Sequence, residues 1–353
     1  MIDGKKLQRI LILRLGAIGD VVQTLPTVRQ LQANFPNLEI SWLLEQKSRP
    51  ILDYDKTINL IEFPKEELKS VNPARAMWRM LKIRKQLKSQ NFDLAIDLQG
   101  LFKSGFLAKF SGAKQVIGFH PQNTREGNQI FLDSYMSAIP KQTMHCIDLY
   151  QQVVRFLGGQ IQPMDDPFQF YFEDHELSSV RTLLHRFRVK RPILLNLGAS
   201  KATKRWPAQY FAKLILMIRE AYPKAHILMT GAGKMDEDTE LEILKSLPPG
   251  TCASAVNKTS LRELALLVKN ASFLISGDSL ALHLGSAFKI PSVGIFGGSA
   301  LPVETKPYWE PYPGLSNPLP CYPCRKRTCS HHSCMTGILP HQVFREFQTY
   351  FQK

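Results

Sequence analysis

The sequence predicts an α/β protein of two domains, each built on a parallel sheet, for three reasons. The chain has 353 residues, and a single hydrophobic core stops growing at about 250–300 residues. Short apolar runs alternate with stretches of helical periodicity, which is typical of βαβ units. This alternation breaks at a polar, irregular region and then restarts. We therefore expect one domain over residues 1–170, a second over 171–335, and a last helix over 336–353 that packs on the body.

The first domain is predicted from its apolar runs. Residues 9–13 are almost wholly apolar and fit a strand buried on both faces, as in a parallel sheet. A helix is expected over 21–34, where apolar residues recur near helical spacing. Further strands are expected at 39–44, 58–63 and 92–97.

The second domain has the same alternation. Its strands are expected at 192–197, 225–230, 273–276 and 292–296. Helices are expected over 208–221 and 260–269, and Ser260 and Glu263 have the spacing of a capping box. Ligands of such sheets bind beyond the carboxyl ends of the strands, where the strand order reverses. We therefore expect a ligand site in a cleft between the domains.

The composition narrows the class of protein. Hydrophobic residues make up 44% and charged residues 21%, which is the globular range. No run of about 18 uncharged apolar residues predicts a membrane-spanning helix, and the first residues lack the layout of a secretory signal. We expect a cytoplasmic protein. Its net charge of +15 attracts nucleic acid, an anionic membrane surface or phosphorylated substrates.

A glycine-containing segment, residues 13–20, follows the first strand and opens the first helix. Glycines let a ligand approach the backbone, and a helix start offers free N–H donors. The spacing is not G-x-G-x-x-G, so a dinucleotide site is not predicted. Asp20 has two interpretations: it caps the helix, or it is a carboxylate in the cleft that acts as a general base.

Three more strand ends carry polar groups. Residues 196–207 include Ser200, Lys201 and Lys204, and such cations and hydroxyls suit a phosphate or diphosphate, or else form a solvated basic turn. At residues 275–283 a helix start favours an anion, although Asp278 and Ser279 could only cap that helix and His283 could be structural. The fourth strand end, residues 97–104, carries Gln99 and Lys103.

Two further segments have an open interpretation. Between residues 65 and 88 there are eight cations and two anions, with apolar residues between them. This is either a solvated face or a basic amphipathic helix that binds an anionic membrane surface. Four cysteines, Cys321, Cys324, Cys329 and Cys334, have a spacing that could hold one zinc ion in a nucleic-acid-binding knuckle, or they are four reduced thiols.

Several segments, taken together and in this order, resemble glycosyltransferase family 9, the lipopolysaccharide heptosyltransferases, over nearly the whole chain. They are residues 9–26, 97–100, 204–207, 277–279, His283 and 294–297. The form Gly-Asp-Val-x-x-Thr-Leu-Pro at residues 19–26 is most similar to the heptosyltransferase I type. The chain departs from the family pattern at Leu280, where the family usually has Gly.

The resemblance implies a GT-B fold, with two Rossmann-like domains whose parallel sheets face a central cleft. It implies an inverting transfer of heptose from ADP-heptose to a Kdo-bearing lipid A type acceptor, without a metal or cofactor. Asp20 is then the catalytic base and Lys204 the cation that neutralises the leaving diphosphate. The expected donor-binding residues are Ser200, Lys201, Asp278, Ser279 and His283. The expected acceptor-binding residues are Gly19, Gln99, Lys103, Arg75, Arg79 and Lys82.

The expected partners follow from this interpretation. They are an ADP-activated sugar, an anionic lipid-linked sugar acceptor, and the cytoplasmic face of the inner membrane by peripheral contact. The alternatives are a transferase of the same fold with another nucleotide sugar or acceptor, an epimerase of that fold, a member that binds without catalysis, and a zinc-dependent nucleic-acid-binding protein. Nucleic acid is disfavoured because the basic residues are spread through both halves of the chain.

Overall fold

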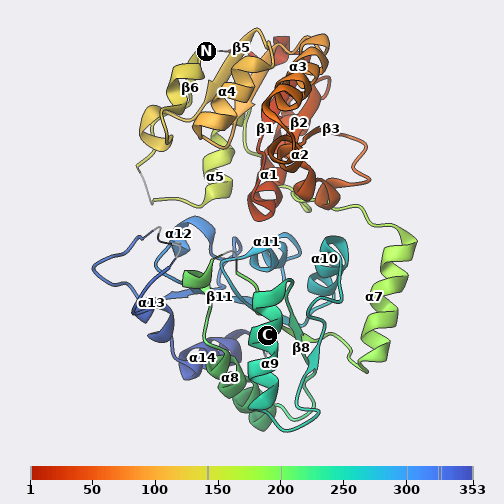
Figure 1. The fold of residues 1–353 in the computed structure, drawn as a ribbon, viewed down its shortest axis with the longest axis vertical. Coiled ribbons are helices and arrows are strands. Elements are labelled where there is room, and N and C mark those ends of the chain that lie inside the picture. Colours follow the sequence, from red (N-terminus) through yellow and green to blue (C-terminus); the bar gives the residue numbers. More distant parts are fainter. Residues whose placement is uncertain are drawn as a thin grey trace. The chain divides into compact units, whose positions relative to one another are not determined.

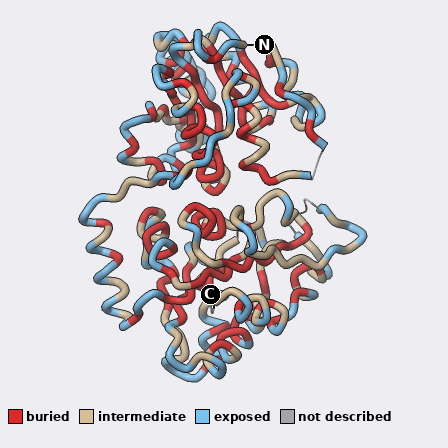
Figure 2. The backbone as a smooth tube through the Cα atoms, turned by 180° about the vertical axis from the view of Figure 1, so that it is seen from behind, coloured by how far each residue is buried: buried red, intermediate tan, exposed pale blue. Residues whose placement is uncertain are grey.

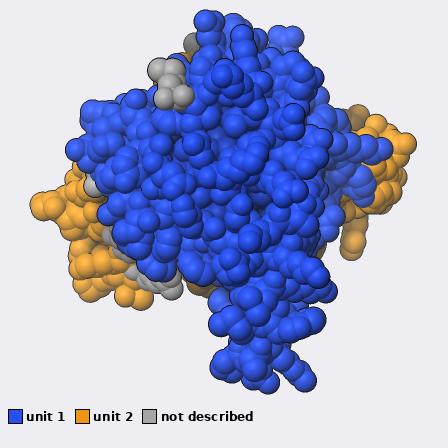
Figure 3. All heavy atoms as spheres, turned by 90° about the horizontal axis from the view of Figure 1, so that it is seen from above, with its two compact units in different colours: residues 1–171 blue, residues 172–353 orange. Residues whose placement is uncertain are grey.

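The computed structural model describes residues 2–140, 143–199, 201–299, 301–324, 326 and 328–351. Their contacts divide the chain into two compact units, Met1–Tyr171 and Phe172–Lys353 (Figure 3). Each unit contains one six-stranded sheet with helices packed around it (Figure 1). The buried residues lie mainly in the interior of each unit (Figure 2).

Unit 1 has the strand order β3-β2-β1-β4-β5-β6, and all neighbouring strands are parallel. Its strands are β1 (Arg9–Leu13), β2 (Glu39–Glu45), β3 (Asn59–Phe63), β4 (Leu94–Asp97), β5 (Gln115–Gly118) and β6 (Ser134–Tyr135). Its α-helices are α1 (Ile18–Asn34), α2 (Lys65–Ser70), α3 (Pro73–Ser89), α4 (Phe102–Phe110), α5 (Cys146–Tyr150) and α6 (Gln152–Phe156). Its 3-10 turns are η1 (Gly4–Lys6), η2 (Gln46–Leu52), η3 (Pro121–Asn123) and η4 (Asn128–Phe131).

Unit 2 has the order β12-β11-β10-β7-β8-β9, again with parallel neighbours. Its strands are β7 (Ile193–Asn196), β8 (Ile227–Thr230), β9 (Ala253–Ser254), β10 (Phe273–Gly277), β11 (Ser292–Phe296) and β12 (Gly314–Ser316). Its helices are α7 (Asp174–Arg186), η5 (Ala202–Lys204), α8 (Ala208–Ala221), α9 (Lys234–Lys245), α10 (Leu261–Lys269), α11 (Leu280–Ala287), α12 (Pro302–Thr305), α13 (Ser333–Thr336) and α14 (Pro340–Phe351).

Both units therefore have the doubly wound order in which the first strand lies at the centre and the chain changes direction beside it. The α/β class with two Rossmann-like units, predicted from the sequence, is confirmed. The change of direction falls between β1 and β4 in unit 1 and between β7 and β10 in unit 2. These two points position the site residues, because ligands of open α/β sheets bind beyond the carboxyl ends of strands at such points.

The observed elements follow from local sequence. Residues 10–13 of β1 are fully buried, as expected for a central parallel strand covered on both faces. The capping box of α10 forms as predicted: the Glu263 N–H donates to the Ser260 hydroxyl at 3.2 Å, and the Ser260 N–H donates to the Glu263 carboxylate at 2.8 Å. The helix α14 packs on α8 and β11 through Val343 and Phe347. Among the residues that the structure describes, no helix is long and apolar enough to span a bilayer.

Candidate active site

The predicted base, Asp20, lies in the first turn of α1, after the loop that leaves β1. One of its oxygens, Oδ2, accepts a hydrogen bond from the Ala17 N–H at 3.3 Å and forms an ion pair with Arg14 Nη2 at 2.7 Å. The first contact is that of a helix cap. The side chain is nevertheless 35% exposed. Asp20 therefore accepts a capping hydrogen bond at the start of α1 while its carboxylate stays partly exposed to solvent.

Arg14, which the sequence analysis missed, holds the Asp20 carboxylate. Its guanidinium is buried, with Nη1 donating to the Leu98 carbonyl at 2.6 Å and Nη2 to the Tyr150 hydroxyl at 2.8 Å. It also lies over the Tyr150 ring, 4.9 Å from the centroid. Burial by itself lowers the pKa of Arg14, but Asp20 and Tyr150 together raise it by more, so the net pKa is raised and the guanidinium stays charged. Burial raises the pKa of Tyr150 far above its usual range, so the phenol stays neutral.

The loop after β4 brings Gln99 to the same place. Gln99 Oε1 accepts a hydrogen bond from the Leu15 N–H at 2.9 Å, which joins this loop to the one that carries Asp20. The fully buried Asp97 carboxylate holds the loop by accepting from the Gln99 N–H at 2.8 Å and the Gly100 N–H at 3.1 Å. Burial raises the pKa of Asp97, although these hydrogen bonds oppose it. Asp97 therefore has a structural role in this loop. The predicted acceptor residue Gly19 is buried in the first turn of α1.

The predicted acceptor residues fall into two groups. Lys103, at the start of α4, lies 3.7 Å from Glu45 Oε1 at the end of β2. The other group lies on the basic helix α3, where Arg79 pairs with Glu67 at 2.9 Å and Lys82 lies over the Trp78 ring at 5.8 Å. Arg75 is exposed on the same helix. These contacts of Arg79 and Lys82 lie within α2 and α3.

In unit 2 the predicted residues Lys204, Asp278, Ser279 and His283 lie together at the carboxyl ends of β7 and β10. The Lys204 ammonium forms an ion pair with the Asp278 carboxylate, whose other oxygen lies 3.9 Å from His283 Nε2. All three side chains are largely buried. Ser279 holds the N-cap position of α11 without a side-chain cap hydrogen bond, and the half-buried Leu280 is the first residue of that helix. Lys201 precedes η5, and Ser200 lies outside the described residues.

Asn196 was missed and lies at the centre of this group. Its Nδ2 donates to the Ser279 hydroxyl at 3.0 Å and to the Ser276 hydroxyl at 3.2 Å. It therefore fixes the turn from which the first N–H groups of α11 start. The signal in the sequence was a polar residue at the end of an otherwise apolar strand, a position that Asp97 holds in β4.

The four clustered cysteines carry free thiols, with Cys334 buried and Cys321 exposed. Cys324 Sγ and Cys334 Sγ both lie within 3.6 Å of the point that a Cβ on Gly298 would occupy. Within the described ranges, no group of three or more histidine, cysteine or acidic side chains is placed to hold a metal ion. The zinc alternative therefore gains no support from the described residues.

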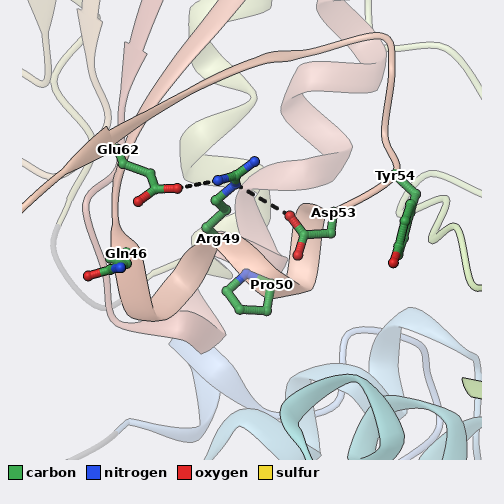
Figure 4. Close-up of a pocket in the computed structure, with 6 residues that line it drawn as sticks. All are labelled: Gln46, Arg49, Pro50, Asp53, Tyr54 and Glu62. Atoms are coloured by element: carbon green, nitrogen blue, oxygen red, sulfur yellow. Dashed lines mark hydrogen bonds and ion pairs between the residues drawn. The ribbon is translucent and has the colours of Figure 1, made fainter.

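A surface hollow in unit 1 lies between η2 and the end of β3 (Figure 4). Its lining residues are Gln46, Arg49, Pro50, Asp53, Tyr54 and Glu62. The Arg49 guanidinium points into it between Glu62, with which it pairs, and Asp53, at 3.4 Å. None of these lining residues is a predicted site residue.

Comparison with known proteins decides the family. The model of glycosyltransferase family 9 (heptosyltransferase) matches residues 80–335. The chain belongs to glycosyltransferase family 9. It is a glycosyltransferase, and the resemblance to this family that the sequence motifs indicated is confirmed.

Relatives of this family 9 chain include lipopolysaccharide and lipooligosaccharide heptosyltransferases. The lipopolysaccharide core heptosyltransferase OpsX of Haemophilus influenzae is 23% identical over 305 residues, covering 84% of this chain and 81% of that protein. Lipopolysaccharide heptosyltransferase 1 of Campylobacter coli is 27% identical over 308 residues, covering 82% and 84%. Other relatives carry the names of types 2 and 3.

Solved structures show the same fold. The family 9 glycosyltransferase of Veillonella parvula has a TM-score of 0.80 at 20% identity, covering 100% of this chain and 98% of that chain. The heptosyltransferase WaaC of E. coli, solved with ADP-2-deoxy-2-fluoro heptose, has a TM-score of 0.73 at 19% identity, covering 97% and 99%. The GT-B class predicted from the resemblance is therefore confirmed. That Asp20 and Lys204 face each other across a cleft stays a prediction.

Proposed function

We propose that the protein transfers heptose from ADP-heptose to a Kdo-bearing lipid A type acceptor, with inversion at the anomeric carbon. One observation carries the proposal beyond family membership. Each sheet presents a complementary group where its strand order reverses: the Asp20 carboxylate after β1 and the Lys204 ammonium after β7. Such a pair is what a direct displacement of a nucleoside diphosphate requires.

Asp20 is the proposed general base. A hydroxyl of the acceptor attacks the anomeric carbon, a C–O bond forms there, and the bond to the diphosphate oxygen breaks. The hydroxyl proton passes to an oxygen of Asp20, which is accessible because its side chain is 35% exposed. A base within hydrogen-bond reach of the attacking hydroxyl removes this proton as the new bond forms.

Lys204 and the start of α11 are proposed to stabilise the leaving ADP. The departing diphosphate gains negative charge, and a fixed ammonium together with free N–H groups at a helix start lowers the energy of that charge. Asp278 holds the Lys204 ammonium in place, and Asn196 holds the Ser279 turn. Because groups of the chain supply this stabilisation, we propose transfer without an essential metal, so that turnover persists in excess chelator.

The acceptor side and the membrane contact belong to unit 1 in this proposal. Gly19, Gln99 and Lys103 lie in or next to the loops around Asp20 and contact the acceptor sugar. The basic helix α3, with Arg75, Arg79 and Lys82, binds the anionic cytoplasmic face of the inner membrane peripherally. Three large apolar side chains of α3 are exposed, namely Met77, Trp78 and Leu81. A basic helix with exposed apolar side chains suits an anionic bilayer surface.

The deciding experiment measures ADP release from ADP-heptose with and without a Kdo-lipid A acceptor. We expect ADP release that depends on the acceptor. We also expect the anomeric configuration of the heptose to be inverted, so that a β-configured donor gives an α-linked product, or an α-configured donor a β-linked one. Release that is equal without acceptor contradicts transfer. A clear preference for a UDP- or GDP-sugar over ADP-heptose would instead favour a family member with another donor.

A further inference from the structure

Three lysines of unit 1 converge on one buried carboxylate at the end of β2. Glu45 Oε1 lies 2.8 Å from Lys65 Nζ and 3.7 Å from Lys103 Nζ, and Glu45 Oε2 lies 3.3 Å from Lys47 Nζ. Each lysine belongs to a different element, Lys47 to η2, Lys65 to α2 and Lys103 to α4, and these elements follow β2, β3 and β4. The sheet topology thus brings together residues that are far apart in sequence.

This lysine cluster, Lys47, Lys65 and Lys103 around Glu45, holds more positive than negative charge. Three ammonium groups face one carboxylate, which leaves an excess of two positive charges. Burial lowers the pKa of Lys103, and the nearby Lys65 lowers it further, while Glu45 opposes both effects. Burial is thus the main cause of the lowered pKa, and a bound anion would favour the charged form of Lys103.

The lysines are open to a ligand while Glu45 is not. The side chains of Lys47, Lys65 and Lys103 are 57%, 32% and 41% exposed, whereas that of Glu45 is 9% exposed. Each ammonium has three N–H donors, so donors remain for a bound anion. The Lys103 ammonium also lies 4.4 Å from the centre of the Phe63 ring, which holds its direction.

The lysine cluster lies against the loop that carries the proposed base. The Glu45 N–H donates to the Leu15 carbonyl at 2.8 Å. A Cβ on Gly16 would lie 3.7 Å from Glu45 Oε2 and 3.6 Å from Ser48 Oγ. The Ser48 hydroxyl is buried and, within the described part of the chain, has no hydrogen-bond partner. Lysines, an unsatisfied hydroxyl and the Asp20 loop therefore meet at one edge of the sheet.

A purely stabilising role does not explain this arrangement. Ion pairs of exposed lysines contribute about 0–1 kcal/mol each, and three lysines on one carboxylate leave charge uncompensated. A site for an anion explains both the excess charge and the exposed donors, because charge-assisted hydrogen bonds to a carboxylate or phosphate are among the stronger polar contacts.

We propose that Lys47, Lys65 and Lys103 form a subsite for a carboxylate or phosphate group of the acceptor, and that Glu45 is its built-in counter-ion. The acceptor's part in this inference rests on the proposed function. Glu45 holds the three ammonium groups together when the subsite is empty, and its charge limits how tightly the anion binds. Anion affinity is therefore a balance between three lysines and one competing carboxylate.

Binding of inorganic phosphate tests the subsite apart from catalysis. Phosphate is titrated by calorimetry into protein with excess ADP present to occupy a diphosphate site in unit 2. We expect Glu45→Gln to tighten phosphate binding about tenfold, and Lys65→Met and Lys103→Met to weaken it about tenfold. Lys213→Met, an exposed lysine of α8, is the matched control and leaves it unchanged. Weaker or equal binding by Glu45→Gln in a folded variant overturns the proposal, as does unchanged binding by both lysine variants.

Acceptor kinetics then identify the anion. Lys103→Met is expected to raise the KM for the intact acceptor about tenfold and to leave the KM for the donor unchanged. Two altered acceptors separate the sources: one without lipid phosphates and one with its sugar carboxylate converted to an amide. For the wild type, only the acceptor that lacks the bound anion should have a raised KM. For Lys103→Met, the KM for that altered acceptor should equal its KM for the intact acceptor. Equal further losses with both acceptors exclude the acceptor as the ligand.

The two proposals can fail separately. Phosphate binding that responds to Glu45 and the lysines as stated, in a protein that transfers no heptose, supports the subsite and rejects the proposed function. Acceptor-dependent transfer with phosphate binding that ignores these residues does the reverse.

Discussion

At the scale of single residues, the candidate site in each unit contains a charged side chain that an oppositely charged partner holds in place. Asp20 is held by the buried Arg14, and Lys204 is held by Asp278. In both cases the partner restricts the side chain, so little rearrangement is needed when charge develops in a reaction. Substitutions at these positions should therefore affect turnover much more than folding.

Asp20→Asn keeps the size and polarity of the side chain but removes its ability to accept a proton. We expect turnover to fall at least 100-fold, the usual contribution of a general base. ADP binding should stay unchanged, because Lys204 and Ser279 belong to unit 2. Turnover and ADP affinity are measured on the same preparation, and near-normal turnover would remove Asp20 from the mechanism.

Lys204→Ala removes the cation from the proposed diphosphate site. Loss of one preorganised charge-stabilising group typically costs about 100- to 1,000-fold in kcat, and ADP should also bind more weakly. Lys213→Ala, on the exposed side of α8, is the control for loss of a lysine. Normal kinetics of Lys204→Ala, measured by ADP release, would contradict its role.

Asp93 offers a prediction on stability rather than activity. Its carboxylate accepts from the Gln8 N–H at 2.9 Å and the Arg9 N–H at 3.1 Å and pairs with Lys114 at 2.7 Å. The Lys114 hydrogen bond is the main reason that the pKa of Asp93 falls from 3.8 to about 2. A lowered pKa stabilises the fold above about pH 4, and the effect is lost as the pH falls toward 2. Asp93→Asn should cost about 2 kcal/mol at pH 7 and flatten the acid limb of urea unfolding.

At the scale of elements, the sequence predicted what is local and missed what is not. The strand β1 and the capping box of α10 were predictable, because an apolar run and a three-residue spacing specify them. The strands β6, β9 and β12 have only two or three residues, too few to show a period. The helix α7 buries only Glu176 and Val180, so its pattern resembles a polar linker.

The site divides in the same way. The positions of Asp20 and Lys204 at strand ends were predictable, because each lies in the segment that follows an apolar strand. Arg14 and Tyr150 were not paired in advance, since 136 residues separate them and only the packing of α5 brings them together. Lys103 was named from the sequence, but its grouping with Lys47 and Lys65 around Glu45 was missed for the same reason: that grouping depends on the order of β2, β3 and β4, which no local pattern encodes.

The helix α3 carries the prediction that belongs to this scale. It buries only Ile83 and Leu87, and Trp78 is 64% exposed beside Lys82. Trp78→Ala should weaken binding to phosphatidylglycerol vesicles about tenfold, because burial of a large apolar side chain in the bilayer surface contributes about 1.5–3 kcal/mol to binding. Vesicle co-sedimentation measures this, with Leu241→Ser, an exposed apolar residue of α9, as the control. Equal losses in both variants would show that no specific role belongs to α3.

At the scale of the whole molecule, the chain passes from unit 1 to unit 2 once, between Tyr171 and Phe172. Each unit has its own sheet and its own core, so the link between them is the natural place for a hinge. The proposed single displacement requires the base of unit 1 and the cation of unit 2 at the same sugar nucleotide. We therefore expect the units to close on their ligands, which also excludes water from the donor.

Small-angle X-ray scattering of Asp20→Asn tests this closure, because that variant should hold ADP-heptose and acceptor together without reaction. We expect a smaller radius of gyration with both ligands than with either alone. Lys204→Ala should compact less, since its grip on the diphosphate is weaker. The free protein and its ligand complexes must be compared in one buffer, because a net charge of +15 makes interparticle repulsion depend on salt. The same radius in every state would mean that Asp20 and Lys204 serve separate sites, and the displacement mechanism would then lose its leaving-group stabilisation.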